Sequence, residues 1–345
     1  MTRPDLTVRG AGIFGLAIAW EAARRGAQVR VIETQAIGAG SSGGIVGALA
    51  PHVPEAWNDK KAFQLESLLM AEGFWTGVEA ASGQATGYGR LGRLQPLADA
   101  GAVALAQARA AQAQTLWQGR AVWTVEPTTG AGWEPFSPTG QVIRDTLSAR
   151  LHPRLATQAM AQAIRAKGGE VLIGAGQEAG PVIWATGYQG LLDLAADLGG
   201  RPGSGVKGQA VLLSYDARDL PQLFVDGLHI VPHADGTVAI GSTSENQWTE
   251  MGVDSQSDGL VARARAALPV LQDAPVIERW AGIRPRAKSR APMLGPWPGR
   301  PGHFLANGGF KIGFGMAPRV AQAMVDLVLE GRDTLPDAFR VTASM

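Results

Sequence analysis

The chain has 345 residues, of which 46% are hydrophobic and 18% are charged, a composition that excludes a disordered or fibrous protein. Lysine and arginine number 31 against 30 aspartates and glutamates, so the net charge of +1 gives no reason to expect a nucleic acid partner. The absence of cysteine excludes disulfides, thiolate catalysis and cysteine-ligated metals.

The length and the apolar pattern predict a soluble protein of two domains. Single hydrophobic cores stop growing at about 250 to 300 residues, so a second core is expected. No stretch reaches the ~18 to 20 consecutive apolar residues of a membrane span. The N-terminal apolar run is interrupted by Arg9 and several glycines, and it lacks the pattern of an export signal. We therefore expect a cytoplasmic protein without membrane contact.

The first forty residues predict a dinucleotide-binding unit. An apolar strand at residues 6–8 leads into the motif Gly10-Ala11-Gly12-Ile13-Phe14-Gly15, which opens a helix that runs toward Gly26. In such a motif the first glycine permits the turn, the second lets the backbone approach a pyrophosphate, and the third lets the helix pack close to the strand. Because a charge is unusual in a buried strand, we expect the strand to end before Arg9.

A second apolar strand at residues 29–32 ends at Glu33, which lies 23 residues after Gly10. An acidic residue at about this spacing hydrogen-bonds the ribose hydroxyls of NAD or FAD and repels the extra phosphate of NADP. Glu33 does not separate NAD from FAD, and the motif alone would also fit a glycine-rich turn in an unrelated α/β protein. The choice between these possibilities depends on the motifs in the rest of the chain.

The later segments add motifs in a fixed order. Residues 40–51 are rich in small side chains, and residues 182–187 form an apolar strand that closes on Ala-Thr-Gly. Residues 227–233 and 235–241 alternate in hydrophobicity around an Asp-Gly turn, which predicts a hairpin. Residues 280–285 read Trp-Ala-Gly-Ile-Arg-Pro, and the glycine-rich residues 308–318 precede a helix expected at 319–330.

In content and in order these segments resemble the D-amino acid oxidase superfamily of FAD enzymes, and most of all its glycine oxidase and sarcosine oxidase branch. The resemblance implies an α/β fold, α+β overall, with a Rossmann-like FAD-binding domain and a second, antiparallel-sheet substrate domain. The FAD-binding domain is expected to be discontinuous, at residues 1–80, 145–203 and 280–345. The substrate domain is expected at residues 81–144 and 204–279.

The resemblance also implies which residues hold the cofactor. FAD is expected to be non-covalent, because the chain has no cysteine and His52 does not stand where the attaching histidine of some relatives stands. The expected cofactor-binding residues are Gly10, Ala11, Gly12, Ile13, Phe14, Gly15, Glu33, Ser41, Ser42, Gly47, Ala48, Leu49, Ala185, Thr186, Gly187, Gly309, Lys311, Ile312, Gly313 and Phe314.

Three residues are candidates for catalysis or substrate binding. Arg284 corresponds to the arginine that grips the substrate carboxylate in this branch, and a planar guanidinium suits that bidentate contact, although a structural salt bridge would also explain it. Lys311 would assist the substrate anion or stabilise negative charge on the reduced flavin, or it is a solvated loop lysine. His229 would line the substrate cavity. His233, four residues on, is a weaker candidate, and with no evident third ligand the two histidines predict no metal site.

The chain departs from the family pattern at three places. Lys311 stands where glycine oxidases tend to carry a second arginine, and lysine is a point charge instead of a planar fork. Ser289 occupies a position that is usually acidic. Residues 171–181 are shorter than the family's usual insert, so the adenine side of the site must be built from fewer residues.

The resemblance implies oxidation of the C–N bond of a small amino acid or secondary amine. Hydride passes to flavin N5, the imine is hydrolysed, and O2 reoxidises the flavin to give hydrogen peroxide. The alternatives are an amine dehydrogenase with another electron acceptor, a flavin-dependent oxidase that modifies wobble uridine in tRNA, a non-catalytic FAD-binding protein and an NAD enzyme. The identity of the amine, the electron acceptor and the oligomeric state, including a homo-oligomer, stay open.

Overall fold

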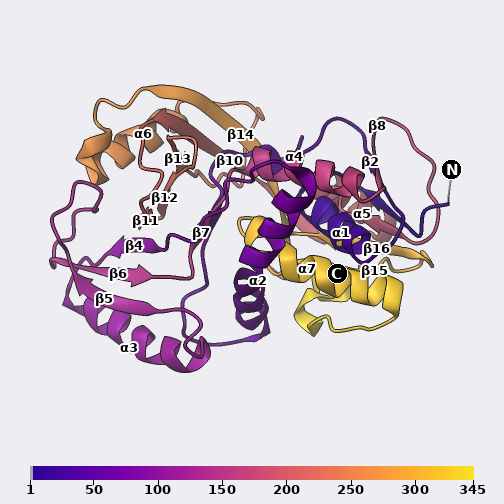
Figure 1. Cartoon of the computed structure of the whole chain (residues 1–345), viewed down its shortest axis with the longest axis horizontal. Helices are drawn as coiled ribbons and strands as arrows, with labels where there is room; N and C mark the ends of the chain where they lie inside the picture. The colour runs from indigo at the N-terminus through magenta and orange to yellow at the C-terminus, as the bar shows by residue number, and fades with distance from the viewer. Residues whose placement is uncertain (1–2) are drawn as a thin grey trace.

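The computed structural model describes residues 3–345 (Figure 1). The smaller of its two main sheets has six strands in the order β15-β16-β9-β1-β2-β8. All neighbouring pairs are parallel except the edge pair β15 and β16. Parallel strands joined through helices place loops at their carboxyl ends on one side of the sheet. The strands are β1 (Leu6–Arg9), β2 (Val29–Glu33), β8 (Glu170–Ile173), β9 (Val182–Trp184), β15 (Met293–Pro296) and β16 (His303–Asn307).

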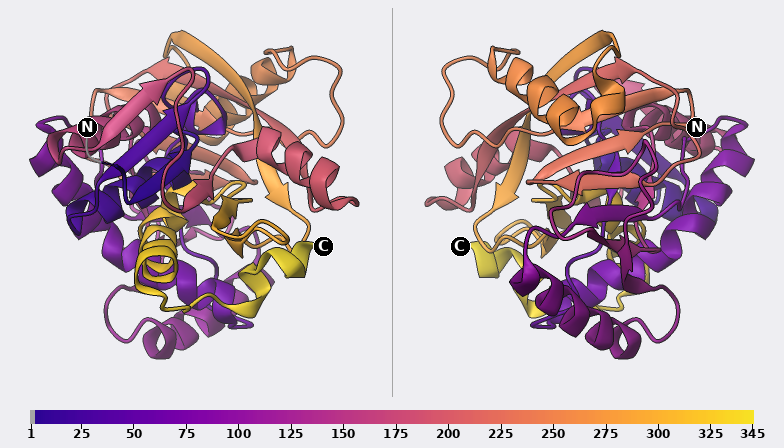
Figure 2. Two further views of the ribbon diagram at one scale, coloured as in Figure 1. Left: turned by 90° about the vertical axis from the view of Figure 1, so that its right-hand side faces the viewer. Right: turned by 90° about the vertical axis from the view of Figure 1, so that its left-hand side faces the viewer.

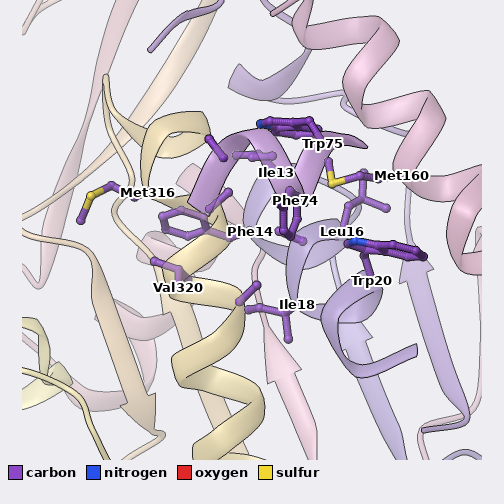
Figure 3. Close-up of a cluster of buried hydrophobic side chains, with 14 of the residues drawn as sticks. Ile13, Phe14, Leu16, Ile18, Trp20, Phe74, Trp75, Met160, Met316 and Val320 are labelled. Carbon is purple, nitrogen blue, oxygen red and sulfur yellow. The ribbon is translucent and has the colours of Figure 1, made fainter. Parts of the chain in front are cut away.

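Helix α1 (Ile13–Arg24) lies in the centre of the helical layer beside this sheet. Its residues from Ile13 to Ala23 are all buried, and Glu21 is the one charged residue among these eleven, so the helix packs on every side. Figure 3 shows its side chains meeting those of α2 (Asp59–Ser82), α4 (Pro153–Ala166) and α7 (Gly313–Glu330). The side views show the yellow α7 beside the indigo N-terminal segment (Figure 2). This packing fixes the N-terminus of α1 relative to the sheet.

The larger sheet has eight strands in the order β14-β10-β13-β12-β11-β4-β6-β5. Its pairs are antiparallel apart from β11 and β4, which run parallel. The hairpin expected on either side of the Asp-Gly turn is confirmed as β12 and β13. The strands are β4 (Arg93–Pro96), β5 (Trp123–Pro127), β6 (Gln141–Asp145), β10 (Gly203–Ser214), β11 (Gln222–Val225), β12 (Leu228–Pro232), β13 (Thr237–Gly241) and β14 (Val276–Ala287).

The remaining elements cover or connect the two sheets. Helix α3 (Ala100–Leu116) packs on β5, α6 (Gln256–Ala267) packs on β10, β12 and β13, and α5 (Gly187–Leu198) packs on β10, β14 and β16. Strands β3 (Ala48–Leu49) and β7 (Ala149–Arg150) pair in a small sheet between the larger ones. Short 3₁₀ helices are η1 (Ser41–Gly43), η2 (Pro269–Leu271), η3 (Asp337–Phe339) and η4 (Val341–Ser344). The predicted α/β fold class is confirmed. Within residues 3–345 no helix combines the length and the apolar character that crossing a membrane requires.

The expected domain boundary at residue 280 falls inside β14. This strand pairs with β10 along its whole length, from Gly203 opposite Ala287 to Leu213 opposite Val276. We therefore propose that the two sheets correspond to the two domains and that the last cofactor-binding segment begins after β14, near residue 288. The expected boundary at residue 80 falls inside α2, two residues before its end at Ser82. The boundaries at 145 and 203 coincide with the end of β6 and the beginning of β10.

Two local expectations were wrong. Arg9 belongs to β1 and pairs with Ile32 of β2. Its charge is accommodated there because Nε donates to Glu178 at 2.6 Å and the guanidinium lies over the Trp184 ring at 5.4 Å. The C-terminal helix begins at Gly313 instead of 319. The later start was expected because proline usually lies in the first turn of a helix. Here a helical turn precedes Pro318, in which the N–H of Met316 donates to the carbonyl of Ile312 at 2.9 Å.

Candidate functional site

A cleft of about 610 Å³ opens at the carboxyl ends of β1, β2, β9 and β16 and extends to β14 of the larger sheet. In open parallel sheets this edge is where ligands bind, because loops and helix N-termini converge there. The expected cofactor-binding residues that line it are Gly10, Gly12, Ile13, Phe14, Glu33, Ser41, Ser42, Ala185, Thr186, Gly187, Gly309 and Gly313. Those outside the lining are Ala11, Gly15, Gly47, Ala48, Leu49, Lys311, Ile312 and Phe314.

The motif glycines leave no room for side chains at the rim of the cleft. Gly10 has φ +100°, and a Cβ there would lie 2.5 Å from the carbonyl oxygen of Ala185. A Cβ on Gly15 would lie 2.0 Å from the carbonyl oxygen of Gly10, so α1 and β1 touch at this point. The first turn of α1 carries no acidic residue, which leaves the positive end of the helix dipole open toward the cleft. This arrangement fits a pyrophosphate.

Glu33 stands at the end of β2 with its carboxylate held by backbone. Its Oε2 accepts from the N–H of Ala11 at 2.8 Å, and its Oε1 accepts from the N–H of Gln35 at 2.9 Å. Oε1 also accepts from the Thr34 hydroxyl at 3.3 Å. A carboxylate offers about four acceptor sites, so about one remains for a hydroxyl donor. The position and the spare acceptor fit the ribose of an adenine dinucleotide.

We expect Glu33→Ala to weaken FAD binding about 10- to 100-fold, because hydrogen bonds to a charged group contribute about 1.5–3 kcal/mol. The measurement is quenching of flavin fluorescence on titration of the apoprotein. Glu170→Ala is the matched control. Glu170 lies on the adjacent strand β8, does not line the cleft, and forms a 2.6 Å ion pair with Arg30. Equal affinities for the two variants would contradict the role of Glu33.

The small-residue segment 40–51 contacts both helix α1 and the larger sheet, and the hydroxyl of Ser42 accepts from the N–H of Ile13 at 2.9 Å. Gly44 packs against the Trp280 ring of β14, and the carbonyl of Ile45 lies 2.9 Å from Nε2 of His233. Gly47 has φ +66°, and a Cβ on it would lie 1.8 Å from the carbonyl oxygen of Leu151, so only glycine fits the chain here. The segment therefore passes close to the larger sheet and to Leu151 on backbone contacts, as a surface for a flat ring requires.

Arg284 is buried on β14, with 8% of its surface exposed. Its Nη1 donates to the carbonyl of Thr243 at 3.1 Å, and within residues 3–345 no carboxylate lies within ion-pair distance. Burial lowers the pKa of Arg284 to about 10, while the nearby charge of Glu245 acts in the opposite direction. The guanidinium stays charged at neutral pH, and most of its donors remain available to a ligand.

Lys311 lies near enough to Arg284 and to His229 to interact electrostatically with both. Loss of solvent around Lys311 lowers its pKa, and the charge of Arg284 lowers it further. The pKa of His229 falls to about 3, first because the ring is buried and then because Arg93 and Lys311 are close. Its Nδ1 has no partner among the described residues, and its ring tilts against Phe224 at 4.7 Å. His229 is therefore a neutral ring with one unused polar atom.

The other histidines have structural contacts. His233 is 1% exposed and lies beside the Ile45 carbonyl, with its ring 5.0 Å from that of His152. His52 bonds through its ring and its backbone N–H to Gln64 on α2. The contact of His233 was not evident in the sequence, because Ile45 lies 188 residues away.

Sequence reasoning missed several residues of the site. Arg93 of β4 is buried beside His229 and forms a 3.0 Å ion pair with Asp145. Gly208 and Thr243 flank the guanidinium of Arg284. The run Lys207-Gly208-Gln209 inside an apolar strand was the available signal, because two polar side chains around a glycine are unusual in a buried strand.

The buried histidines predict a loss of stability in mild acid. The pKa values of His229 and His233 are lowered from the ordinary value of 6.5 to about 3 and about 4, mainly by burial. Below pH 6.5 the unfolded chain therefore binds protons that the folded chain does not, so stability falls as the pH decreases toward the folded-state values. Between pH 7 and pH 5 each histidine should cost about 2 kcal/mol.

Urea unfolding at the two pH values measures this difference. His229→Gln should reduce the difference by about 2 kcal/mol. Arg24→Gln, at an exposed side chain, should leave it unchanged. A pH dependence that is the same in His229→Gln and in the unsubstituted protein would contradict the assignment.

Comparison with known proteins places the chain among flavin enzymes. The family model described as DAO, FAD dependent oxidoreductase, matches residues 5–327. Glycine oxidase of Bacillus licheniformis is 26% identical over 369 residues, which cover 95% of this chain and 93% of the relative. Glycine oxidase of Pseudomonas aeruginosa is 31% identical over 173 residues, 50% of this chain and 44% of the relative. The bifunctional protein ThiO/ThiG of Nostoc sp. is 28% identical over 371 residues, 100% of this chain and 55% of the relative. The matched parts thus span about half the length of the last two relatives.

Solved structures share the fold. Glycine oxidase from Geobacillus kaustophilus superposes with a TM-score of 0.85 at 22% identity and covers 100% of both chains. Iminodiacetate oxidase from Chelativorans sp. BNC1 superposes with a TM-score of 0.83 at 21% identity, over 96% of this chain and 97% of the other. At these identities the likeness establishes the arrangement of the two sheets and their helices.

Proposed function

The chain belongs to the DAO family of FAD-dependent oxidoreductases, and from this premise we propose that it oxidises the C–N bond of a small amino acid or secondary amine. The resemblance to the D-amino acid oxidase superfamily is confirmed, and the glycine oxidases among the relatives support that branch. The family is FAD-dependent, so FAD is the cofactor and the protein is an enzyme.

The observation that carries the proposal is the environment of Arg284. A buried guanidinium without a carboxylate partner is costly, because a charge removed from water needs a counterion or several hydrogen bonds. Among residues 3–345 the guanidinium of Arg284 makes one hydrogen bond, to the Thr243 carbonyl. A substrate carboxylate would supply the missing charge in the planar, bidentate geometry that arginine favours.

The residues of the cleft suit FAD. The glycines around the α1 N-terminus and Glu33 would hold the pyrophosphate and the adenosine ribose, and segments 40–51 and 308–314 would surround the flavin. When bound, FAD supplies the hydride acceptor for oxidation of the amine. The protein would contribute orientation. A substrate that is held with its reacting carbon next to the hydride acceptor needs no further alignment before it reacts.

Three side chains would act on the substrate. Arg284 would bind the carboxylate and thereby set the position of the α-carbon. Lys311 would add a second positive charge near the same anion or near the flavin. His229 is neutral at working pH, so its Nδ1 would accept or donate one hydrogen bond without adding charge. No acid or base is required if the amine arrives neutral, and water hydrolyses the released imine.

The test is the visible spectrum of the purified protein during anaerobic addition of glycine, sarcosine, proline, iminodiacetate and D-amino acids. We expect a yellow protein that one of these amines bleaches. Hydrogen peroxide on readmission of air identifies an oxidase, and its absence identifies a dehydrogenase with another acceptor. A yellow protein that none of them bleaches would contradict a small amino acid or amine as the substrate and would favour a larger, RNA-borne amine.

A further inference from the structure

The guanidinium of Arg284 crosses a neighbouring strand at a glycine. In the pairing of β14 with β10, Arg284 lies opposite Val206, and Gly208 lies two residues farther along β10 on the same face of the sheet. A Cβ built on Gly208 would lie 2.0 Å from Nη2, 2.1 Å from Cζ and 2.1 Å from Nη1 of Arg284. The guanidinium therefore occupies the space that any other residue at position 208 would fill.

The far side of the guanidinium is held by the segment that follows β13. Thr243 accepts from Nη1 of Arg284 through its carbonyl, and it is itself fixed on β10, because its Oγ1 accepts from the N–H of Gln209 at 2.8 Å. Two residues on, Glu245 pairs with Lys207 through two backbone hydrogen bonds of 2.9 and 3.0 Å. Arg284 thus reaches from β14 across β10 to this third segment.

The segment is anchored strongly on the other face of β10. Lys207 is buried, and its Nζ lies 2.9 Å from a carboxylate oxygen of Asp254 and 3.4 Å from one of Glu245. The side chain of Gln209 donates to Asp254 at 2.8 Å and accepts from the Asp254 N–H at 2.9 Å. The carbonyl of Thr243 is therefore a fixed acceptor, and the open surface of Gly208 lets the guanidinium reach it.

We propose that Gly208 is a positioning residue for Arg284: the missing side chain lets the guanidinium lie across β10, with its remaining N–H groups open to a substrate carboxylate. This inference rests on the proposed function, in which Arg284 binds that carboxylate. Gly208 has no side chain with which to bind a substrate or a cofactor. It acts by determining where the guanidinium can lie.

The substitution Gly208→Ala tests the proposal. The three nearest atoms to the new methyl group all belong to the flexible Arg284 side chain, so the guanidinium should lift from the strand and lose its bond to Thr243. We expect the affinity for a carboxylate to fall about 10- to 100-fold, since a displacement of about 1 Å is enough to remove well-aligned contacts. The affinity for a neutral ligand of the same shape should not change.

The measurement is titration of the FAD-loaded protein with acetate and with acetamide, followed by the flavin absorption spectrum. The variants are Gly208→Ala, Arg284→Met and their combination. Gly252→Ala is the control, because Gly252 lies in a loop with nothing within 4 Å of a Cβ. We expect Gly208→Ala to weaken acetate alone, and to have no further effect when Arg284 is already methionine.

Each other outcome is decisive. Acetate affinity equal to that of the unsubstituted protein, or an equal loss in the Arg284→Met background, would overturn the positioning role. If Gly208→Ala does not fold, the combined variant should fold, because methionine removes the guanidinium that collides; failure of both would overturn the proposal. If the unsubstituted protein binds no acetate and no amine reduces its flavin, the proposed function itself fails.

Discussion

Replacing Arg284 with methionine is expected to raise the KM for a carboxylate-bearing amine about 30-fold or more, with a smaller change in kcat. Truncation of one partner of a buried, hydrogen-bonded charge pair costs about 2–5 kcal/mol, and 1.4 kcal/mol corresponds to a factor of 10. Arg284 is 8% exposed and has no carboxylate partner within residues 3–345, so the lost binding would be that of the substrate. Steady-state kinetics with the amine that bleaches the flavin measure both constants.

Arg279→Met is the matched control for this prediction. Arg279 lies on the same strand, but its guanidinium pairs with Asp258 at 2.7 Å and with the Ser257 hydroxyl at 2.7 Å on helix α6. An exposed pair of this kind contributes about 0–1 kcal/mol to stability. We expect its kinetic constants to match those of the unsubstituted protein within about twofold. An unchanged KM in Arg284→Met would contradict the proposal that the Arg284 side chain binds the substrate carboxylate.

The parts of the fold that the sequence predicts are those determined by local pattern. The strand, glycine turn and helix at residues 6–24 require only residues within a few positions of one another. The hairpin of β12 and β13 has the same local character, because the Asp-Gly turn determines the pairing. Glu33 was predicted to bind the ribose from its spacing alone, because it ends the strand that follows the glycine motif and its helix.

The parts that could not be predicted depend on long-range pairing. Gly208 matters because β14 pairs with β10, some seventy residues away, and that register is invisible in the sequence. His229 and His233 have the same strand spacing, and only the approach of Ile45 shows that His233 is already bonded. The place of Arg9 in a strand could not be predicted, because its contacts with Glu178 and Trp184 come from segments about 170 residues away.

Substituting Gly15 with alanine is expected to lower both the stability of the protein and its affinity for FAD. A Cβ on Gly15 would lie 2.0 Å from the Gly10 carbonyl oxygen and 3.3 Å from the Cβ of Ala185. The first obstacle is backbone and cannot rotate away, so α1 must move from β1. Overpacking of this kind costs about 1–3 kcal/mol, and α1 is packed between α4, α7 and the strands β1 and β2.

The displacement also moves the helix N-terminus that faces the cleft, so we expect apoprotein to bind FAD at least about tenfold more weakly. Gly73→Ala is the matched control, because Gly73 is also helical, is exposed on α2 and has nothing within 4 Å of a Cβ. There alanine should stabilise by up to about 1 kcal/mol and leave FAD affinity unchanged. Urea unfolding of the apoproteins and flavin fluorescence quenching separate the two effects. If Gly15→Ala and Gly73→Ala gave the same FAD affinity, the close contact of α1 with β1 would not be what shapes the cofactor site.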